Sequence, residues 1–248
     1  MIVAKPKSFR DLVDSPRGEI GAHPNEVHGT TVIALRFDKG VLVIADRRAT
    51  AGNLIMYDLA EKVMPLDDHT VVAISGAFAR SVEVCRFLKH SFKYYRRTVL
   101  NEMSLEGKLT EISKSLAGNA PMAAQGIGVF LPIVAAYDLK TSQFGVYFFD
   151  GAGARFQNGS YACAGSGSER IRGVFEYVAR TKGHFETRPL GDVLAEGLQM
   201  LDIAADLDSA TGGFNKILPI VRVLDQEGNR EYPERQLQTA VNEVLGRK

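Results

Sequence analysis

The sequence has no tryptophan, only two cysteines and few histidines. Cys85 and Cys163 lie far apart, and neither belongs to a pair with the spacing of a metal site. We therefore expect two partly buried free thiols and a reducing compartment. The five histidines show no ligand spacing either, so we expect no metal and no cofactor.

The chain also lacks long apolar runs and a strong charge of one sign. No segment reaches the roughly 18 apolar residues of a membrane-spanning helix, and the first 29 residues contain no apolar stretch of the kind found in secretory signals. The formal net charge is +1, with acids and bases interspersed. We expect a cytoplasmic protein that binds neither nucleic acid nor membranes.

What is present is enough apolar material for a substantial core, because 45% of the 248 residues are hydrophobic. No linker of glycine and proline divides the middle, which predicts one domain over residues 30–224. Residues 1–29 are rich in proline, glycine and charge, which is typical of a disordered tail or of a propeptide. In the tail, residues 225–248, the spacing of the apolar side chains predicts a short helix docked on the body or on a neighbour: Leu237, Val241, Val244 and Leu245.

The apolar periodicity predicts strands and helices in blocks. TTVIALRF and VLVIADRR form a hairpin around Asp38-Lys39-Gly40, and EKVMPL pairs with TVVAISG. Helical spacing predicts helices over 78–99, 104–116, 168–181 and 190–207. Further strands are expected in GIGVFLPIVAAYD, FGVYFFD, SYACAGSG and LPIVRVLD. This order predicts an α+β fold, a four-layer αββα sandwich of two mainly antiparallel sheets between helix pairs.

Gly29-Thr30-Thr31 stands where the polar leader meets the first strand. If the bond between Gly29 and Thr30 is cut, Thr30 carries a hydroxyl and a free α-amine, a nucleophile and a base in one residue. Asp46 and Lys62 follow downstream. Each charge taken singly is typical of a strand end or of a weak surface pair, but their joint occurrence with Gly-Thr-Thr indicates a hydrolase.

Six motifs in this order resemble the β subunits of the proteasome core particle, which are N-terminal-nucleophile hydrolases: GTTVIAL, ADRRAT, EKV, SGA, GSGS and DSATGG. The chain is most similar to the single-type β subunits of bacterial proteasomes, from Gly29 to about Leu224. The resemblance implies the N-terminal-nucleophile hydrolase fold and threonine-type endopeptidase activity. It also implies a zymogen whose propeptide, residues 1–29, is removed by self-cleavage between Gly29 and Thr30.

The resemblance assigns catalytic roles residue by residue. Thr30 matches the nucleophile, and its own α-amine, with an ordinary pKa of about 7.7 to 8.0, would accept the hydroxyl proton. Lys62 lowers the pKa of that amine and stabilises negative charge on the threonine oxygen, while Asp46 holds the lysine. Gly76 would offer its backbone N–H to the oxyanion.

The remaining matched positions support the nucleophile or bind substrate. Ser166, Asp208 and Thr211 match the group that orders the threonine amine and a water, and Arg48 resembles the family's structural arginine. The positions matched to substrate binding hold the substrate backbone as an added strand, at Thr50 and Phe78, or line the specificity pocket, at Ala49, Ala60, Met64 and Ile74. Because the four pocket residues are apolar, we expect cleavage after large hydrophobic residues.

The resemblance also implies partners: α subunits and other β subunits in heptameric rings stacked as α7β7β7α7, a ring ATPase reached through the α ring, and unfolded protein substrates. Two alternatives stay open. An HslV-type peptidase or another N-terminal-nucleophile amidohydrolase is disfavoured by the leader, by ADRRAT and by DSATGG. A noncatalytic ring subunit is disfavoured by the intact Thr30, Asp46 and Lys62.

Overall fold

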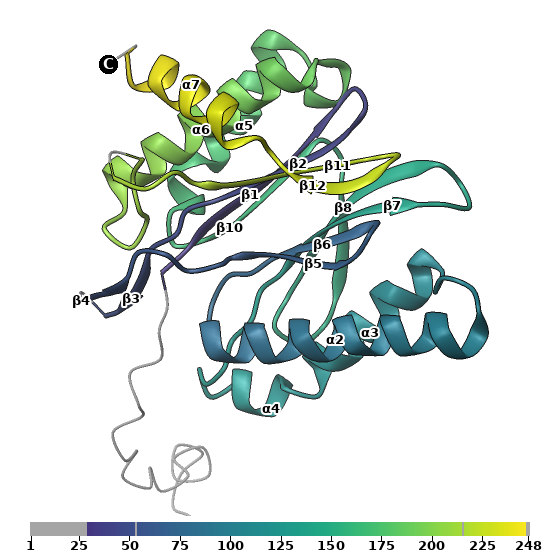
Figure 1. Ribbon diagram of the computed structural model, residues 1–248. Coiled ribbons are helices and arrows are strands. Elements are labelled where there is room, and N and C mark those ends of the chain that lie inside the picture. The colour runs from purple at the N-terminus through teal and green to yellow at the C-terminus, as the bar shows by residue number, and fades with distance from the viewer. Residues whose placement is uncertain (1–28, 53, 215, 247–248) are drawn as a thin grey trace, which may run out of the picture.

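Two five-stranded antiparallel sheets form the centre of the fold, and helices cover their outer faces (Figure 1). The structure is a computed structural model and describes residues 29–52, 54–214 and 216–246. The predicted α+β fold with four layers is confirmed. Among the described residues, no helix is both long and apolar enough to cross a bilayer.

The first sheet has the strand order β10-β1-β2-β11-β12. Its strands are β10 (Tyr161–Gly165), β1 (Thr31–Phe37), β2 (Gly40–Ala45), β11 (Ile220–Asp225) and β12 (Gly228–Glu231). The predicted hairpin is formed by β1 and β2, but Gly40 pairs with Phe37 and belongs to β2. The connection is therefore the two residues Asp38 and Lys39 rather than three.

The second sheet has the strand order β5-β6-β7-β8-β9. Its strands are β5 (Val63–Asp67), β6 (Thr70–Ala73), β7 (Ile133–Asp138), β8 (Gln143–Phe149) and β9 (Arg155–Asn158). A separate small hairpin joins β3 (Ala49–Ala51) to β4 (Leu54–Tyr57). The predicted strand over GIGVFLPIVAAYD begins only at Ile133, because Gly126 and Gly128 adopt positive φ angles of 78° and 63° and turn the chain before it.

The helices form the two outer layers. Helices α2 (Phe78–Val99), α3 (Leu105–Ala117) and the short α4 (Ala120–Ala123) lie on the side of the second sheet. Helices α5 (Ser168–Lys182) and α6 (Leu190–Leu207), the 3₁₀ turn η1 (Phe185–Thr187) and α7 (Glu234–Leu245) lie on the side of the first sheet. The four helices predicted from periodicity are confirmed to within a residue or two, and so is the tail helix.

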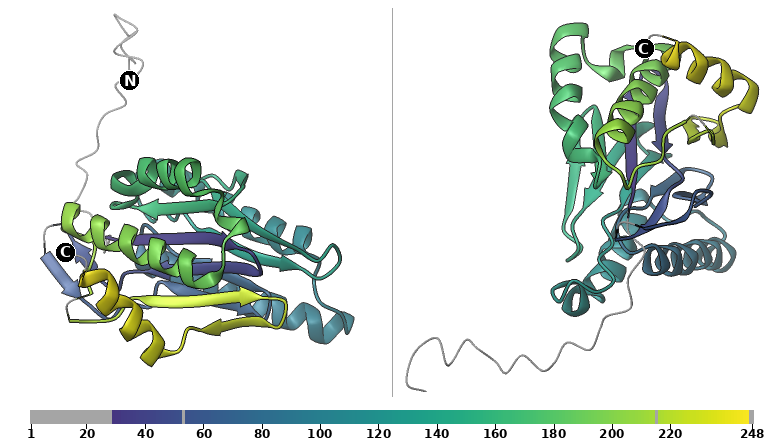
Figure 2. Two further views of the ribbon diagram at one scale, coloured as in Figure 1. Left: turned by 90° about the horizontal axis from the view of Figure 1, so that it is seen from above. Right: turned by 90° about the vertical axis from the view of Figure 1, so that its left-hand side faces the viewer.

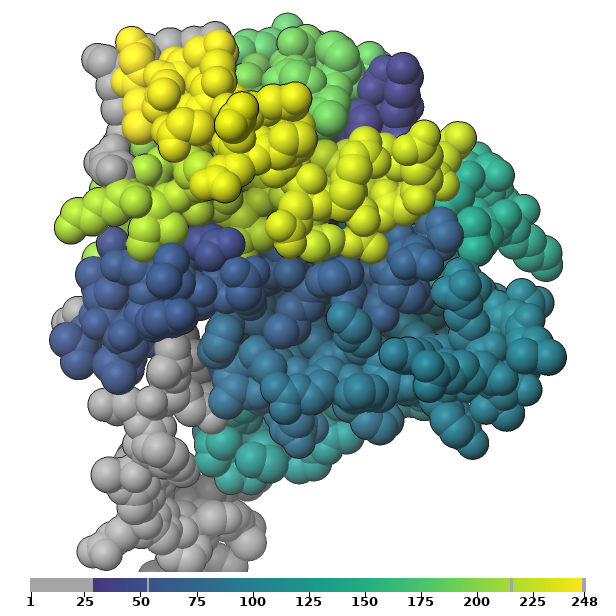
Figure 3. All heavy atoms as spheres, in the orientation of Figure 1, coloured from purple at the N-terminus to yellow at the C-terminus, as the bar shows by residue number. Residues whose placement is uncertain are grey.

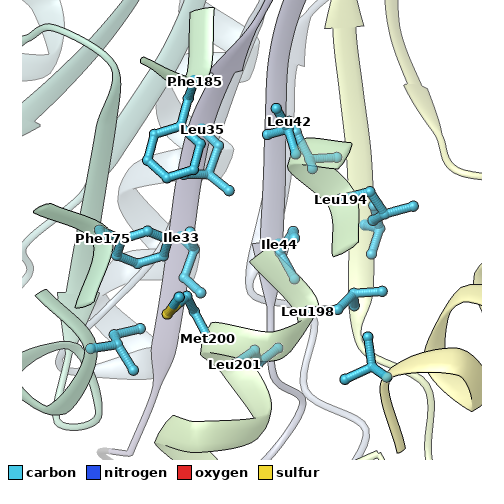
Figure 4. Packing of buried hydrophobic residues seen from close by; sticks show 14 of the residues in the cluster. Ile33, Leu35, Leu42, Ile44, Phe175, Phe185, Leu194, Leu198, Met200 and Leu201 are labelled. Carbon is cyan, nitrogen blue, oxygen red and sulfur yellow. The ribbon is translucent and has the colours of Figure 1, made fainter. Parts of the chain in front are cut away.

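Strand β1 shows how the layers are filled. Ile33 and Leu35 point to the helices, where they pack with residues of α5 and α6 (Figure 4), whereas Val32 and Ala34 point to the second sheet. The layer between the sheets consists mainly of valine and alanine. A third cluster joins the second sheet to α2 and α3. The tail helix α7 docks on the body of its own chain, with Leu237, Val241 and Val244 in the first-sheet cluster.

The two cysteines are free thiols in different layers. Cys85 on α2 is buried, and burial raises the pKa of its thiol to about 12. Cys163 on β10 is partly buried, and burial raises its thiol pKa to about 11 against the lowering effect of Arg172. Neither thiol is ionised near neutral pH. Among the described residues, no group of three or more histidine, cysteine or acidic side chains is placed to hold a metal ion.

Candidate functional site

The candidate site lies where β1 begins and β2 ends. Because these strands are antiparallel neighbours, Val32 pairs with Ala45, and just beyond this pair Asp46 lies beside Thr31, the residue after Thr30. The backbone N–H of Asp46 donates to the carbonyl of Thr31 at 3.2 Å. Lys62 stands directly before β5 of the other sheet. The site therefore sits at one end of the sandwich, where both sheets contribute to it.

Asp46 and Lys62 form a fully buried ion pair, with 2.7 Å between Lys62 Nζ and Asp46 Oδ1. Burial lowers the pKa of Lys62, and the Asp46 carboxylate opposes this by favouring the ammonium. Asp46 accepts three backbone N–H bonds as well, from Thr31 at 2.8 Å and from Arg48 and Gly212 at 2.9 Å each. Because the carboxylate and the ammonium pair with each other and the carboxylate accepts further hydrogen bonds, both charges are tolerated in the buried interior.

The ammonium of Lys62 also reaches the bond expected to be cut. In the uncut chain, Lys62 Nζ donates to the carbonyl oxygen of Gly29 at 2.9 Å and, over a short distance, to the carbonyl oxygen of Arg48. The Thr30 hydroxyl donates to the same Gly29 oxygen at 2.5 Å. A cation and a hydroxyl thus converge on one peptide carbonyl inside a buried site.

Gly29 is held in a conformation that other residues avoid. Its φ is 113°, and a Cβ at this position would lie 2.3 Å from Oγ1 of Thr50 and 3.1 Å from Cβ of Ala210. The residue before Thr30 therefore has to be a glycine for both backbone and steric reasons. The same short distance shows that Thr50, on β3, lies beside the bond between Gly29 and Thr30.

A second hydrogen-bonded group follows the end of α6. Asp208 Oδ2 accepts from the hydroxyls of Ser166 and Thr211, each at 2.6 Å. Burial alone would raise the pKa of Asp208, but these two bonds and the N–H of Ala210 outweigh it and lower the pKa. Thr211 Oγ1 lies 2.6 Å from Oγ1 of Thr31, so this group meets β1 at the residue after Thr30.

Arg48 ties the segment after β2 to the loop after α6. Its guanidinium donates to Asp58 Oδ1 at 3.1 Å, to the carbonyl of Ser209 at 3.2 Å and to that of Thr211 at 3.4 Å. Its backbone N–H is one of the donors to Asp46. Arg48 therefore ties together the two segments whose backbone N–H groups, at Arg48 and Gly212, donate to Asp46 Oδ2.

The residues expected to bind substrate differ in their exposure. Ala49, Ala60 and Ile74 are buried, whereas Met64 and Phe78 are half-buried at the starts of β5 and α2. Ala60 donates its N–H to the carbonyl of Arg47, and Ile74 donates to that of Lys62. Gly76 has a φ of 98°, and a Cβ there would lie 2.1 Å from the carbonyl oxygen of Val129, so no side chain fits at the position expected to supply the oxyanion donor.

Sequence reasoning missed several residues that build the site. Gly165 has a φ of 97°, and a Cβ there would lie 1.9 Å from the carbonyl oxygen of Thr30. A Cβ at Gly167 would lie 2.2 Å from Thr31 Oγ1. Both glycines stand in the GSGS motif, which carried a signal for them. Asp58, the partner of Arg48, stands in no motif, and nothing in the sequence pointed to it.

Comparison with known proteins shows to which family the chain belongs. A family model described as "Proteasome subunit" matches residues 26–216. The chain belongs to the proteasome subunit family. It is 35% identical over 238 residues to the "Proteasome subunit beta" of Acidimicrobium ferrooxidans, covering 95% of this chain and 84% of that protein. It is 34% identical over 224 residues to the "Proteasome subunit beta" of Streptomyces griseus subsp. griseus, covering 89% of this chain and 78% of that protein.

A third relative, the "Proteasome subunit beta" of Frankia casuarinae, is 33% identical over 243 residues, covering 96% of this chain and 86% of that protein. The expected resemblance to bacterial proteasome β subunits is confirmed. Membership in the proteasome family places the chain among subunits of multi-subunit, protein-degrading hydrolases.

Proposed function

We propose that the chain is the catalytic β subunit of a self-compartmentalised proteasome, a threonine-type endopeptidase of the cytoplasm. It hydrolyses peptide bonds of unfolded proteins with Thr30 as its N-terminal nucleophile. The observation that carries this proposal is the convergence of the Lys62 ammonium and the Thr30 hydroxyl on the Gly29 carbonyl, beside the buried Asp46.

The first step is self-cleavage of the zymogen. The Thr30 hydroxyl turns from the carbonyl oxygen of Gly29 to the carbonyl carbon and attacks it. The hydroxyl proton passes to the Thr30 nitrogen as the C–N bond breaks, which leaves an ester between Gly29 and Thr30 Oγ1. Lys62 stabilises the negative charge that develops on the Gly29 oxygen, 2.9 Å away. Water then hydrolyses the ester and releases residues 1–29 as the propeptide.

The second step is peptide hydrolysis by the freed residue. The new α-amine of Thr30 takes the proton of its own hydroxyl, directly or through a water. The nearby Lys62 ammonium disfavours protonation of that amine, so a larger fraction is neutral at pH 7. The Thr30 oxygen attacks the substrate carbonyl, and the N–H of Gly76 stabilises the oxyanion. As the C–N bond breaks, the α-ammonium gives its proton to the leaving amine, and water then hydrolyses the ester between Thr30 and the acyl fragment. Asp208, with Ser166 and Thr211, orders the amine and the water.

Substrate would bind as an added strand along Thr50 and Phe78, with the residue before the cut in a pocket lined by Ala49, Ala60, Met64 and Ile74. The apolar lining favours cleavage after large hydrophobic residues. Fluorogenic peptides that differ only in this residue test the preference, and faster cleavage after glutamate than after leucine or tyrosine would contradict it.

The partners proposed are α subunits and further copies of this chain in heptameric rings stacked as α7β7β7α7, with a ring ATPase bound through the α ring.

The decisive experiment measures the intact mass of the chain co-expressed with its α subunit, next to Thr30→Ala. We expect loss of residues 1–29 in the wild type and not in the variant. An uncut wild-type chain in a fully assembled particle would refute the proposal and indicate a noncatalytic ring subunit.

A further inference from the structure

The residues around Gly76 continue the second sheet beyond the ends of its strands. In β6 and β7, Ala73 pairs with Ile133, and an isolated antiparallel bridge pairs Gly76 with Phe130 in the same register. Residues 128–131, here called the bridge segment, therefore run beside residues 75–77, directly before α2. In the right-hand view of Figure 2, α2 lies in the lower half, away from α5, α6 and α7.

The hydrogen bonds around this bridge direct the N–H of Gly76 away from the bridge segment. The N–H of Leu131 donates to the carbonyl of Ser75 at 3.0 Å, and the N–H of Ala77 donates to that of Val129 at 2.7 Å. Both bonds belong to residues on either side of the bridged pair, so Gly76 is in a pair that exchanges no hydrogen bonds of its own. The N–H of such a residue points to the opposite side of its strand.

The opposite side is the side of the catalytic lysine. Ile74, two residues before Gly76, donates its N–H to the carbonyl of Lys62 at 2.8 Å. Alternate residues of an extended segment direct their N–H groups to the same side, so the N–H of Gly76 is aimed toward the side on which Lys62 lies. Because an oxyanion donor acts only in the correct direction, the bonds between residues 75–77 and the bridge segment bear on catalysis.

Two buried polar side chains hold the bridge segment in place. The hydroxyl of Ser75 donates to the carbonyl oxygen of Leu131 at 3.0 Å, which adds a side-chain bond to the backbone bond between these residues. Nδ2 of Asn119 donates to the carbonyl oxygen of Gly128 at 2.7 Å. Helices α2 and α4 form the lower part of the surface in Figure 3, whereas Ser75 is only 2% exposed and Asn119 7%. Water therefore has little access to replace either bond.

We propose that Ser75 is a positioning residue for peptide hydrolysis, because its bond to Leu131 holds the N–H of Gly76 where the oxyanion of the substrate develops. The inference rests on the proposed function, which names Gly76 as the donor, and adds the side chain that positions it. It also distinguishes the two reactions of the site. In self-cleavage the negative charge develops on the Gly29 oxygen, to which Lys62 donates at 2.9 Å, whereas peptide hydrolysis depends on Gly76.

The test replaces Ser75 with alanine in the full chain co-expressed with its α subunit. Loss of an oxyanion donor costs roughly 100- to 1,000-fold in kcat, so a displaced donor should lower kcat for a fluorogenic peptide by about tenfold. The KM and the rate of self-cleavage, followed by intact mass, should stay within about twofold of the wild type. In the control Ser115→Ala, a hydroxyl bond to a backbone carbonyl is lost at 2.9 Å within α3, and neither reaction should change.

Two results would overturn the proposal. The first is a kcat of Ser75→Ala that falls by less than about threefold. The second is an equal slowing of self-cleavage and peptide hydrolysis, which would indicate general damage to the site. Asn119→Ala, which releases the other end of the bridge segment, should lower kcat without slowing self-cleavage.

Hydrogen exchange provides a readout that requires no catalysis. It is measured by mass spectrometry in Thr30→Ala with and without Ser75→Ala. The amides of Ala77 and Leu131, which close the bridge, should exchange at least about tenfold faster without the Ser75 hydroxyl. Equal exchange would refute the positioning role. Wild-type particles that hydrolyse no peptide would instead refute the proposed function, and the exchange rates would still decide whether Ser75 holds the bridge.

Discussion

Replacing Lys62 with methionine tests the central step of the proposed chemistry. Methionine keeps most of the length and apolar character of the side chain but removes the ammonium that donates to Gly29 O at 2.9 Å and to Asp46 Oδ1 at 2.7 Å. Loss of one donor to a developing oxyanion costs about 2.7 to 4 kcal/mol, or roughly 100- to 1,000-fold in rate. We expect Lys62→Met to slow self-cleavage by this factor.

The same change also destabilises the fold, since it leaves the fully buried Asp46 carboxylate without its cation. Breaking a buried pair in this way costs about 3 to 5 kcal/mol. A matched control is available at the far end of the second sheet, where the buried Lys108 pairs with Asp67 at 2.8 Å. Lys108→Met should lower the melting temperature in a similar way and leave self-cleavage unchanged.

The assay follows the intact mass of both variants and the wild type over time, at a temperature where all three are folded by circular dichroism. If Lys62→Met cleaves itself within tenfold of the wild type, or no more slowly than Lys108→Met, the reasoning is wrong. The wild type has a pH signature as well. Because burial lowers the pKa of Lys62, its ammonium is lost at a pH below the ordinary value of 10.5, and self-cleavage should fall as the pH rises through that region.

Three further predictions concern the surrounding structure. Gly165→Ala should destabilise the chain by several kcal/mol in urea unfolding, since its φ is positive and its Cβ would strike a carbonyl; Gly173→Ala, which faces open space in α5, should not. The lowered pKa of Asp208 means that its ionised form stabilises the fold above the ordinary value of 3.8, so the advantage of wild type over Asp208→Asn in unfolding free energy should be present at pH 7 and vanish as the pH falls below that value. Iodoacetamide at pH 8 should modify Cys163 slowly, and Cys85 only after unfolding, as read by peptide mass; rapid modification of native Cys85 would contradict its burial.

The sequence predicted the elements that bury apolar side chains and missed those that do not. Helix α2 was predicted with its observed bounds, Phe78–Val99, because Cys85, Leu88 and Phe92 repeat at helical spacing. The edge strands β9 and β12 read RFQN and GNRE. They lack apolar alternation because most of their side chains are exposed, although each strand pairs with the strand directly before it in the sequence.

The candidate site divides in the same way. Thr30, Asp46 and Lys62 could be selected from motifs, and the structure brings them to one place. The role of Thr31 could not be selected, because its hydrogen bonds to Asp46 and Thr211 join residues 15 and 180 positions apart. Its neighbour Gly165 contributes to the site because it has no side chain, and a search of the sequence for functional groups does not identify such a residue.

The double anchoring of Thr31 has a consequence for where the chain is cut. Two threonines stand in tandem, and either carries a hydroxyl that could in principle attack the preceding carbonyl. The Thr31 N–H is committed to Asp46, and its hydroxyl lies 2.6 Å from that of Thr211. Thr30 alone has its hydroxyl on the carbonyl that precedes it. The hydrogen bonds of Thr31, which does not react, therefore determine that Thr30 attacks. A shift of β1 by one residue would place Thr31 at the attacking position and move the cut by one bond.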